Sequence, residues 1–130
     1  MRFMMILPAP PEALETKICG VPDKEVVLAM RKYNDEMKKA GVLLLAEGLH
    51  PTSKGTRVKA IGGKKVVTDG PFTEAKEVVA GFWLIQAKSK EEAIEWAQRC
   101  PLPEPGIIEI RQVFENADFP PELQKRHAGA

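Results

Sequence analysis

Six ionisable side chains in the middle of the chain could form a charged pocket around a turn at residues 69–71. They are three carboxylates, two cations and an imidazole, namely Glu47, Asp69, Glu74, Arg57, Lys76 and His50. Carboxylates and imidazole transfer protons, and Arg and Lys hold anionic groups. Asp69 is the strongest candidate, because the stiff turn imposed by Gly70 and Pro71 would fix its carboxylate.

Two functions from different classes would use this pocket. The first is small-molecule binding, in a ligand-binding or regulatory role, with Glu47, Arg57, Asp69, Glu74 and Lys76 as ligand contacts. The second is cofactor-independent acid–base catalysis by Asp69 with His50 or Glu47. Structural roles stay open beside both: Asp69 would cap the turn, Glu47 would pair with Arg57 across a hairpin, and the other charges would face water.

Other kinds of chemistry are not predicted. The chain has no nucleophile elbow, no phosphate-binding glycine loop and no cluster at metal-ligand spacing, so we expect neither metal nor cofactor. With 19 basic and 18 acidic residues and no basic stripe, nucleic acid is not an expected direct partner. Cys19 and Cys100 are far apart, as expected of reduced thiols in a cytoplasmic protein. The apolar start at 1–7 is too short for a membrane span or a signal peptide.

The pocket must be positioned by helices and strands that alternate along the chain. Asp23 is a suitable N-cap for a helix to Ala40, with Val26, Met30, Tyr33, Met37 and Ala40 as its core face. A second helix begins at Ser89, where Ser89-x-x-Glu92 forms a capping box. Apolar runs predict strands at 2–7, 42–49, 77–87 and 107–114, and Gly62-Gly63 predicts a hairpin with strands 57–61 and 64–68.

Without the hairpin, this order is strand, helix, strand, strand, helix, strand, the ferredoxin-like βαββαβ arrangement of an α+β fold with two helices on one face. We expect one domain at 1–115, with a loop at 8–22 and an inserted β-hairpin at 56–68, and a C-terminal tail at 116–130. The strand from Val78 to Ile85 is apolar on both faces. Two helices cover only one face, so the pattern predicts a homodimer.

The stretch Asp69–Glu77, Asp-Gly-Pro-Phe-Thr-Glu-Ala-Lys-Glu, resembles the Asp-Gly-Pro-Phe-Ala-Glu-Thr-Lys-Glu signature of the DGPFAETKE (DGPF-domain) branch of the YCII-related proteins. The similarity extends to Glu47-Gly48-Leu49, to Gly81-Phe82-Trp83-Leu84-Ile85, and to residues 92–97 and 100–101. The resemblance implies a bacterial protein that pairs as a dimeric α+β barrel and whose biochemical activity is unassigned.

The same resemblance bears on partners and chemistry. Relatives are associated with sigma factors, which implies a possible sigma-factor association through a partner and not through DNA contact by this chain. In YCII-related proteins a histidine on the first helix, paired with an aspartate, is a suggested catalytic dyad. The corresponding helix here reads Arg31-Lys32-Tyr33-Asn34-Asp35 and has no histidine. The dyad chemistry of relatives is therefore not expected in this chain.

Overall fold

The computed structural model describes residues 1–9, 24–72, 74–102 and 104–125. The first strand, β1, runs over Arg2–Ala9, so it includes the first two residues of the expected loop at 8–22. The rest of that loop lies outside the described residues. So does the end of the tail, including His127.

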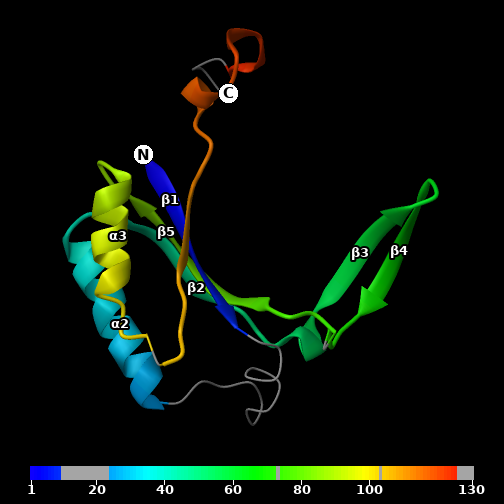
Figure 1. Cartoon of the computed structure of the whole chain (residues 1–130), viewed down its shortest axis with the longest axis horizontal. Helices are drawn as coiled ribbons and strands as arrows, with labels where there is room; N and C mark the ends of the chain where they lie inside the picture. The colour runs from blue at the N-terminus through cyan, green and yellow to red at the C-terminus, as the bar shows by residue number, and fades with distance from the viewer. Residues whose placement is uncertain (10–23, 73, 103, 126–130) are drawn as a thin grey trace.

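A four-stranded antiparallel sheet and two helices form the body of the molecule (Figure 1). The strands are β1, β2 (Leu43–Gly48), β5 (Val78–Gln86) and β6 (Glu109–Gln112), in the spatial order β2-β5-β1-β6. Helices α2 (Lys24–Lys39) and α3 (Lys90–Gln98) lie on the same face of this sheet. The ferredoxin-like βαββαβ fold is therefore confirmed. Among the described helices, none combines the length and the apolar character needed to span a membrane.

The core lies between the sheet and the helices. Phe3, Met5, Met37 and Ile85 are its largest fully buried side chains. Phe3 and Met5 on β1 and Ile85 on β5 alternate with more exposed residues, as expected of strands with one face on a core. On α2, Tyr33 and Met37 are buried as predicted, but Ala40 is exposed because the helix ends at Lys39. Gly41 then takes a positive φ of 73° and turns the chain into β2.

The start of α3 follows its sequence signal with one difference. The Ser89 hydroxyl accepts a hydrogen bond from the Glu92 N–H at 3.1 Å, which is the predicted N-cap. The Glu92 carboxylate, however, accepts from the N–H of Lys88 at 3.2 Å and not from that of Ser89. The reciprocal half of the capping box is therefore shifted by one residue.

The second face of the sheet has an apolar centre and carries none of the described helices. Residues paired across antiparallel strands share a face, which places Met4 beside Leu84 and Leu84 beside Leu45. A parallel row joins Ile6, Phe82 and Glu47. We call this surface the open face. Leu45 is 45% exposed there. The rows end in charged residues, Glu47 on β2 and Arg111 and Glu109 on β6, so an exposed apolar centre is bordered by charges.

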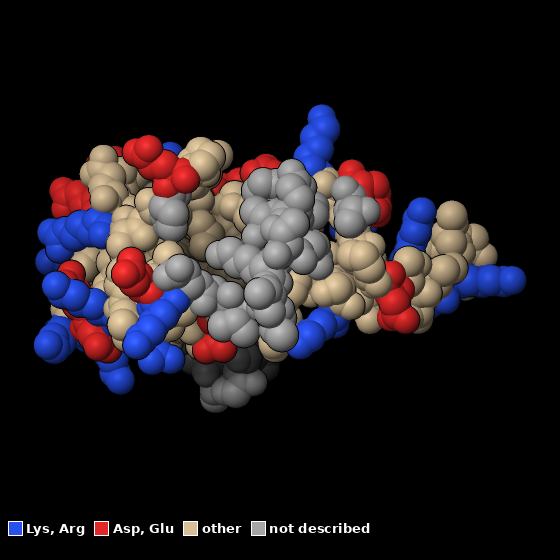
Figure 2. Space-filling view, turned by 90° about the horizontal axis from the view of Figure 1, so that it is seen from below, with Lys and Arg blue, Asp and Glu red and all other residues tan. Residues whose placement is uncertain are grey.

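A β-hairpin is inserted between β2 and β5 and forms a separate two-stranded sheet, as predicted. Its strands are β3 (Thr56–Ile61) and β4 (Lys64–Asp69), and every residue of both strands is exposed. Gly62 and Gly63 both have positive φ, 56° and 76°, which is the geometry of a primed two-residue turn. Figure 1 shows the hairpin projecting on the side of the sheet away from α2 and α3. In Figure 2, basic side chains gather toward its tip.

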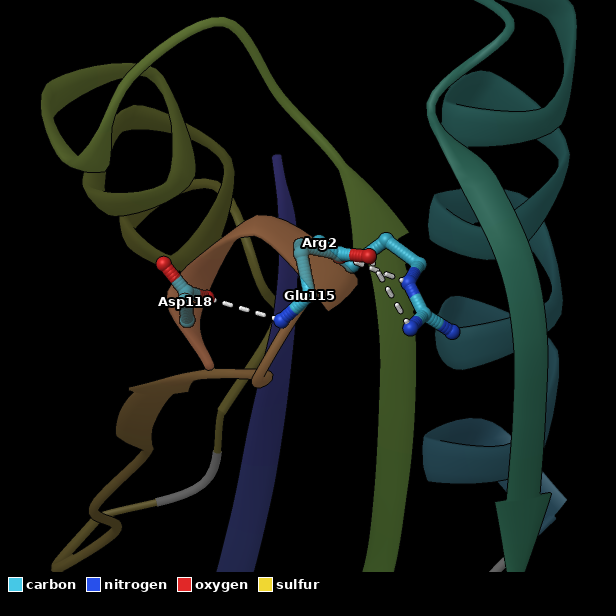
Figure 3. A network of polar contacts seen from close by, with 3 residues as sticks. All are labelled: Arg2, Glu115 and Asp118. Atoms are coloured by element: carbon cyan, nitrogen blue, oxygen red, sulfur yellow. Dashed lines mark hydrogen bonds and ion pairs between the residues drawn. The ribbon is translucent and has the colours of Figure 1, made fainter. Parts of the chain in front are cut away.

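The C-terminal segment, residues 113–125, leaves the short strand β6 and is fixed at the start of β1. Strand β6 covers only 109–112 of the predicted 107–114. Arg2 Nε donates to a Glu115 carboxylate oxygen at 2.8 Å, and the Glu115 N–H donates to Asp118 at 2.7 Å (Figure 3). The hydrogen bond and charge of Arg2 lower the pKa of the Glu115 carboxyl, so it is a carboxylate at neutral pH.

The rest of this segment folds on itself as two short 3₁₀ turns, Asn116–Asp118 and Pro121–Leu123. The Asn116 amide exchanges two hydrogen bonds with the backbone of Lys125, at 2.7 and 2.9 Å. The rings of Phe114 and Phe119 stack with centroids 5.3 Å apart, yet Phe114 is 72% exposed. The segment is therefore ordered by its own contacts while large apolar side chains stay uncovered.

The Cys100 thiol is buried between α3 and α2, with its sulfur 3.8 Å from that of Met30. Burial raises its pKa to about 11. At pH 8 we expect a Cys19→Ser variant to react with a thiol reagent about 100-fold more slowly when native than when unfolded in urea, because only the thiolate reacts. Equal rates in the two states, measured by absorbance, would contradict this burial.

Candidate functional site

The signature turn docks against the segment that follows β2, and Gly70 makes the closest approach. Its N–H donates to the Gly55 carbonyl oxygen at 2.9 Å. A Cβ at residue 70 would lie 1.7 Å from the carbonyl oxygen of Thr52, within the 3₁₀ turn Thr52–Lys54. Gly70 is therefore required because two backbones touch here, and its φ is not in the left-handed region.

Phe72 forms a small apolar centre at the hairpin base, separate from the main core. It is 6% exposed, and its N–H donates to the Thr52 hydroxyl at 3.2 Å. The guanidinium of Arg57 lies over its ring, 3.8 Å from the centroid. Such a stack is an electrostatic attraction worth about 0.5–1 kcal/mol at an exposed position, and it holds the guanidinium plane in one orientation.

Arg57 also pairs with a carboxylate of the signature stretch. Its Nη1 lies 3.6 Å from Glu74 Oε1, and the two side chains are 52% and 73% exposed. The alternative sequence interpretation, a pair between Glu47 and Arg57 across the hairpin, is wrong. Arg57 is directed to Phe72 and Glu74, whereas Glu47 lies on the open face opposite Phe82.

Asp69 closes the base of the hairpin. It is the last residue of β4 and is paired with Thr56, whose hydroxyl donates to Asp69 Oδ1 at 3.0 Å. The carboxylate thus bonds across the hairpin, in place of the turn-capping role weighed from the sequence. Asp69 is exposed, and none of the hydrogen bonds among the described residues reaches its second carboxylate oxygen.

The other predicted site residues take no part in these contacts. His50 is exposed and precedes the buried Pro51, and Lys76 is exposed in the bend that leads into β5. The structure therefore brings together Arg57 with Glu74, and Asp69 with Thr56. Among the described residues it does not link Glu47, His50 or Lys76 to either pair. No group of three His, Cys, Asp or Glu in the described part of the chain is placed to hold a metal.

Sequence reasoning missed Thr52, Thr56 and the role of Phe72 as the platform for Arg57. Thr56 could have been found, because the Gly62-Gly63 turn fixes the register and that register pairs Thr56 with Asp69. The contacts of Thr52 depend on how the chain leaves the sheet, and no local pattern signals that path.

Two polar residues of α2, Tyr33 and Asn34, serve packing. The Tyr33 hydroxyl donates to the Trp96 carbonyl oxygen at 2.6 Å, and burial raises the pKa of this phenol. The indole N–H of Trp83 donates to Asn34 Oδ1 at 2.7 Å, and the Tyr33 and Trp83 rings meet edge to face. Asp35 is exposed. Tyr33 and Asn34 thus join α2 to α3 and β5.

The chain matches known proteins along most of its length. The family model of the YCII-related domain matches residues 1–117. The uncharacterized protein R00369 of Rhizobium meliloti (strain 1021) is 32% identical over 91 residues, which cover 68% of this chain and 73% of that protein. The match includes the sheet, both helices and the signature turn, so the chain belongs to the YCII-related family.

Proposed function

We propose that this protein is a homodimeric small-molecule-binding protein with a ligand-binding or regulatory role, and that its site lies at the hairpin base. The observation that carries the proposal is the fixed guanidinium of Arg57, stacked on Phe72 and half exposed. A planar cation that is held in one orientation and is still half exposed is suited to bind an anionic group such as a carboxylate.

Asp69 supplies the second polar feature of the proposed site. One of its carboxylate oxygens is oriented by Thr56, which leaves the other to accept a hydrogen bond from a ligand hydroxyl or amine. The ligand class is therefore a small organic acid that also carries a donor group. Glu47, Glu74 and Lys76 are proposed to line the rim.

The homodimer follows from the open face. Its apolar rows need a covering layer, and a second copy packed face to face would supply one. We expect Leu45→Asp to raise the dimer dissociation constant at least about 30-fold, because a central charge would be desolvated. The matched control is Leu28→Asp on α2, since Leu28 is 52% exposed against 45% for Leu45. Equal effects of the two variants in sedimentation equilibrium would contradict dimerisation through this face.

The ligand proposal is tested by calorimetry and thermal shift with a panel of small organic acids. Arg57→Ala is expected to weaken binding at least about tenfold, because a charge-assisted hydrogen bond and its orientation are lost. Lys59→Ala is the control, since it removes a like charge from the same face of β3. Asp69→Asn keeps an acceptor for Thr56 and removes the charge, so it separates ligand contact from hairpin closure. Identical affinities of the Arg57 and Lys59 variants would contradict the site.

The same titrations separate binding from catalysis. A binding protein returns its ligand unchanged, whereas the acid–base alternative, with Asp69 and His50 or Glu47, consumes it. Recovery of the ligand is measured by mass spectrometry after prolonged incubation. Turnover that is lost in Asp69→Asn would favour the enzyme over the binding role.

A further inference from the structure

Two projections of the molecule expose apolar side chains that nothing within the described chain covers. The first is the hairpin, where Val58 and Val67 form a cross-strand pair and are each 65% exposed. The second is the C-terminal segment, where Phe114 is 72% and Leu123 is 64% exposed. An isolated two-stranded hairpin is marginally stable in water, so a ribbon of this kind gains most from a surface that packs against it.

The two projections carry opposite charges. The hairpin, residues 56–69, has four basic residues and one acidic residue, and its basic residues are Arg57, Lys59, Lys64 and Lys65. The C-terminal segment, residues 113–125, has three acidic residues and one basic residue, Lys125. Of the acidic residues, Glu115 is paired with Arg2, and the other two are Asp118 and Glu122. Side chains alternate between the two faces of a strand, so Lys65 shares a face with Val58 and Val67, whereas Arg57, Lys59 and Lys64 lie on the other face. The hairpin is basic as a whole, and Lys65 is the basic residue beside its apolar pair.

The two projections lie at opposite ends of the sheet and cannot meet within one chain (Figure 1). The hairpin leaves at the end where Gly48 pairs with Gly81, while Glu115 is fixed to Arg2, which pairs with Gln86 at the other end. Two copies packed face to face would bring these ends together if the twofold axis runs across the strands. An axis along the strands would instead place the two basic hairpins side by side, where their like charges repel.

We propose that the β3–β4 hairpin of one protomer docks on the C-terminal segment of its partner, so that a homodimer is closed by two identical clasps. Val58 and Val67 would pack on the aromatic pair of that segment, and Lys65 would lie near Glu122. Each strand of the hairpin has six residues and therefore reaches about 20 Å, enough to pass the edge of a sheet packed about 10 Å away. This inference rests on the proposed homodimer. It adds the direction of the twofold axis, and it adds the hairpin as a second contact beside the open face.

Cross-linking between differently labelled protomers tests the clasp. In a Cys19→Ser background, Val67→Cys is mixed with a size-tagged Leu123→Cys chain, and the mixture is oxidised after subunit exchange. We expect a disulfide-linked heterodimer between these two variants. The control partner is Leu28→Cys, which is similarly exposed but lies on α2. A heterodimer formed equally well with Leu28→Cys would overturn the clasp, as would dominant self-linking of Val67→Cys.

Sedimentation of the same samples separates this inference from the proposed homodimer. A dimer that forms no link between Val67→Cys and Leu123→Cys overturns the clasp and leaves the homodimer standing. A monomer overturns both.

A charge exchange tests the clasp without cysteines. Lys65→Glu and Glu122→Lys are each expected to weaken the dimer up to about fivefold, the scale of an exposed ion pair. The chain with both changes should recover the original affinity. Lys90→Glu, on α3, is the control and should leave the affinity unchanged. Additive weakening in the double variant would overturn the proposed pairing.

Discussion

Gly70→Ala is expected to lower the free energy of unfolding by about 3 kcal/mol or to detach the hairpin base, because the new methyl group has no room. Its Cβ would stand 1.7 Å from the carbonyl oxygen of Thr52, and that oxygen belongs to the backbone and cannot rotate away. To relieve the overlap, the Thr52–Lys54 turn must move. That movement would break the bonds from Gly70 to Gly55 and from Phe72 to Thr52.

Alanine substitutions at two other glycines, Gly48 and Gly55, give a series in which the space for the new methyl group varies. A Cβ at Gly55 would lie 3.3 Å from the same oxygen, and a Cβ at Gly48 would meet nothing within 4 Å. We expect destabilisation to increase from Gly48→Ala to Gly55→Ala to Gly70→Ala in urea unfolding. Limited proteolysis at residues 49–77 would report local detachment. Stability of Gly70→Ala equal to that of Gly48→Ala would refute the close approach.

Ile85→Ala is expected to cost about 2–5 kcal/mol of folding free energy, because it leaves a cavity in the centre of the core. Ile85 is fully buried and is flanked in the sheet by Phe3 on β1 and Leu43 on β2. It belongs to the face covered by the helices, so its loss should affect folding and not the predicted dimer surface. The melting temperature of the variant, followed by circular dichroism, measures the cost.

Ile107→Ala is the matched control, because it deletes the same atoms from a side chain that is 60% exposed. We expect its stability to change by less than about 0.5 kcal/mol. If Ile107→Ala proved as costly as Ile85→Ala, the assignment of the core would be wrong.

Much of the fold could be predicted because its signals are local. The Gly62-Gly63 dipeptide specifies the hairpin turn by itself, and Ser89 followed by Glu92 specifies the start of α3. The order of the elements then allows few arrangements of the strands in the sheet, which is why the βαββαβ topology could be predicted from the sequence. The exposure of Ala40 was not predicted, since spacing alone does not show where a helix stops.

The candidate site was less predictable, because its contacts join segments that are separated in sequence. Thr56 and Asp69 are 13 residues apart, and Thr52 and Phe72 are 20 apart. The sequence offered Arg57 and Asp69 as candidates, and the alternative it offered for Arg57, a pair with Glu47, named a different carboxylate from Glu74. The reason is geometric: the hairpin turns away from the sheet, so Arg57 meets the signature stretch and Glu47 remains with the strands.

The insertion point of the hairpin has a consequence for how the protein can diversify. Strands β2 and β5 are antiparallel neighbours in the sheet, so a short loop could join them without residues 49–77. The insert thus sits where chains tolerate gain or replacement of segments. Core residues such as Ile85 are constrained by the packing of the core, whereas the insert can change its length and its charge without disturbing that packing. New recognition properties can therefore be grafted here, by evolution or by design, without redesign of the scaffold.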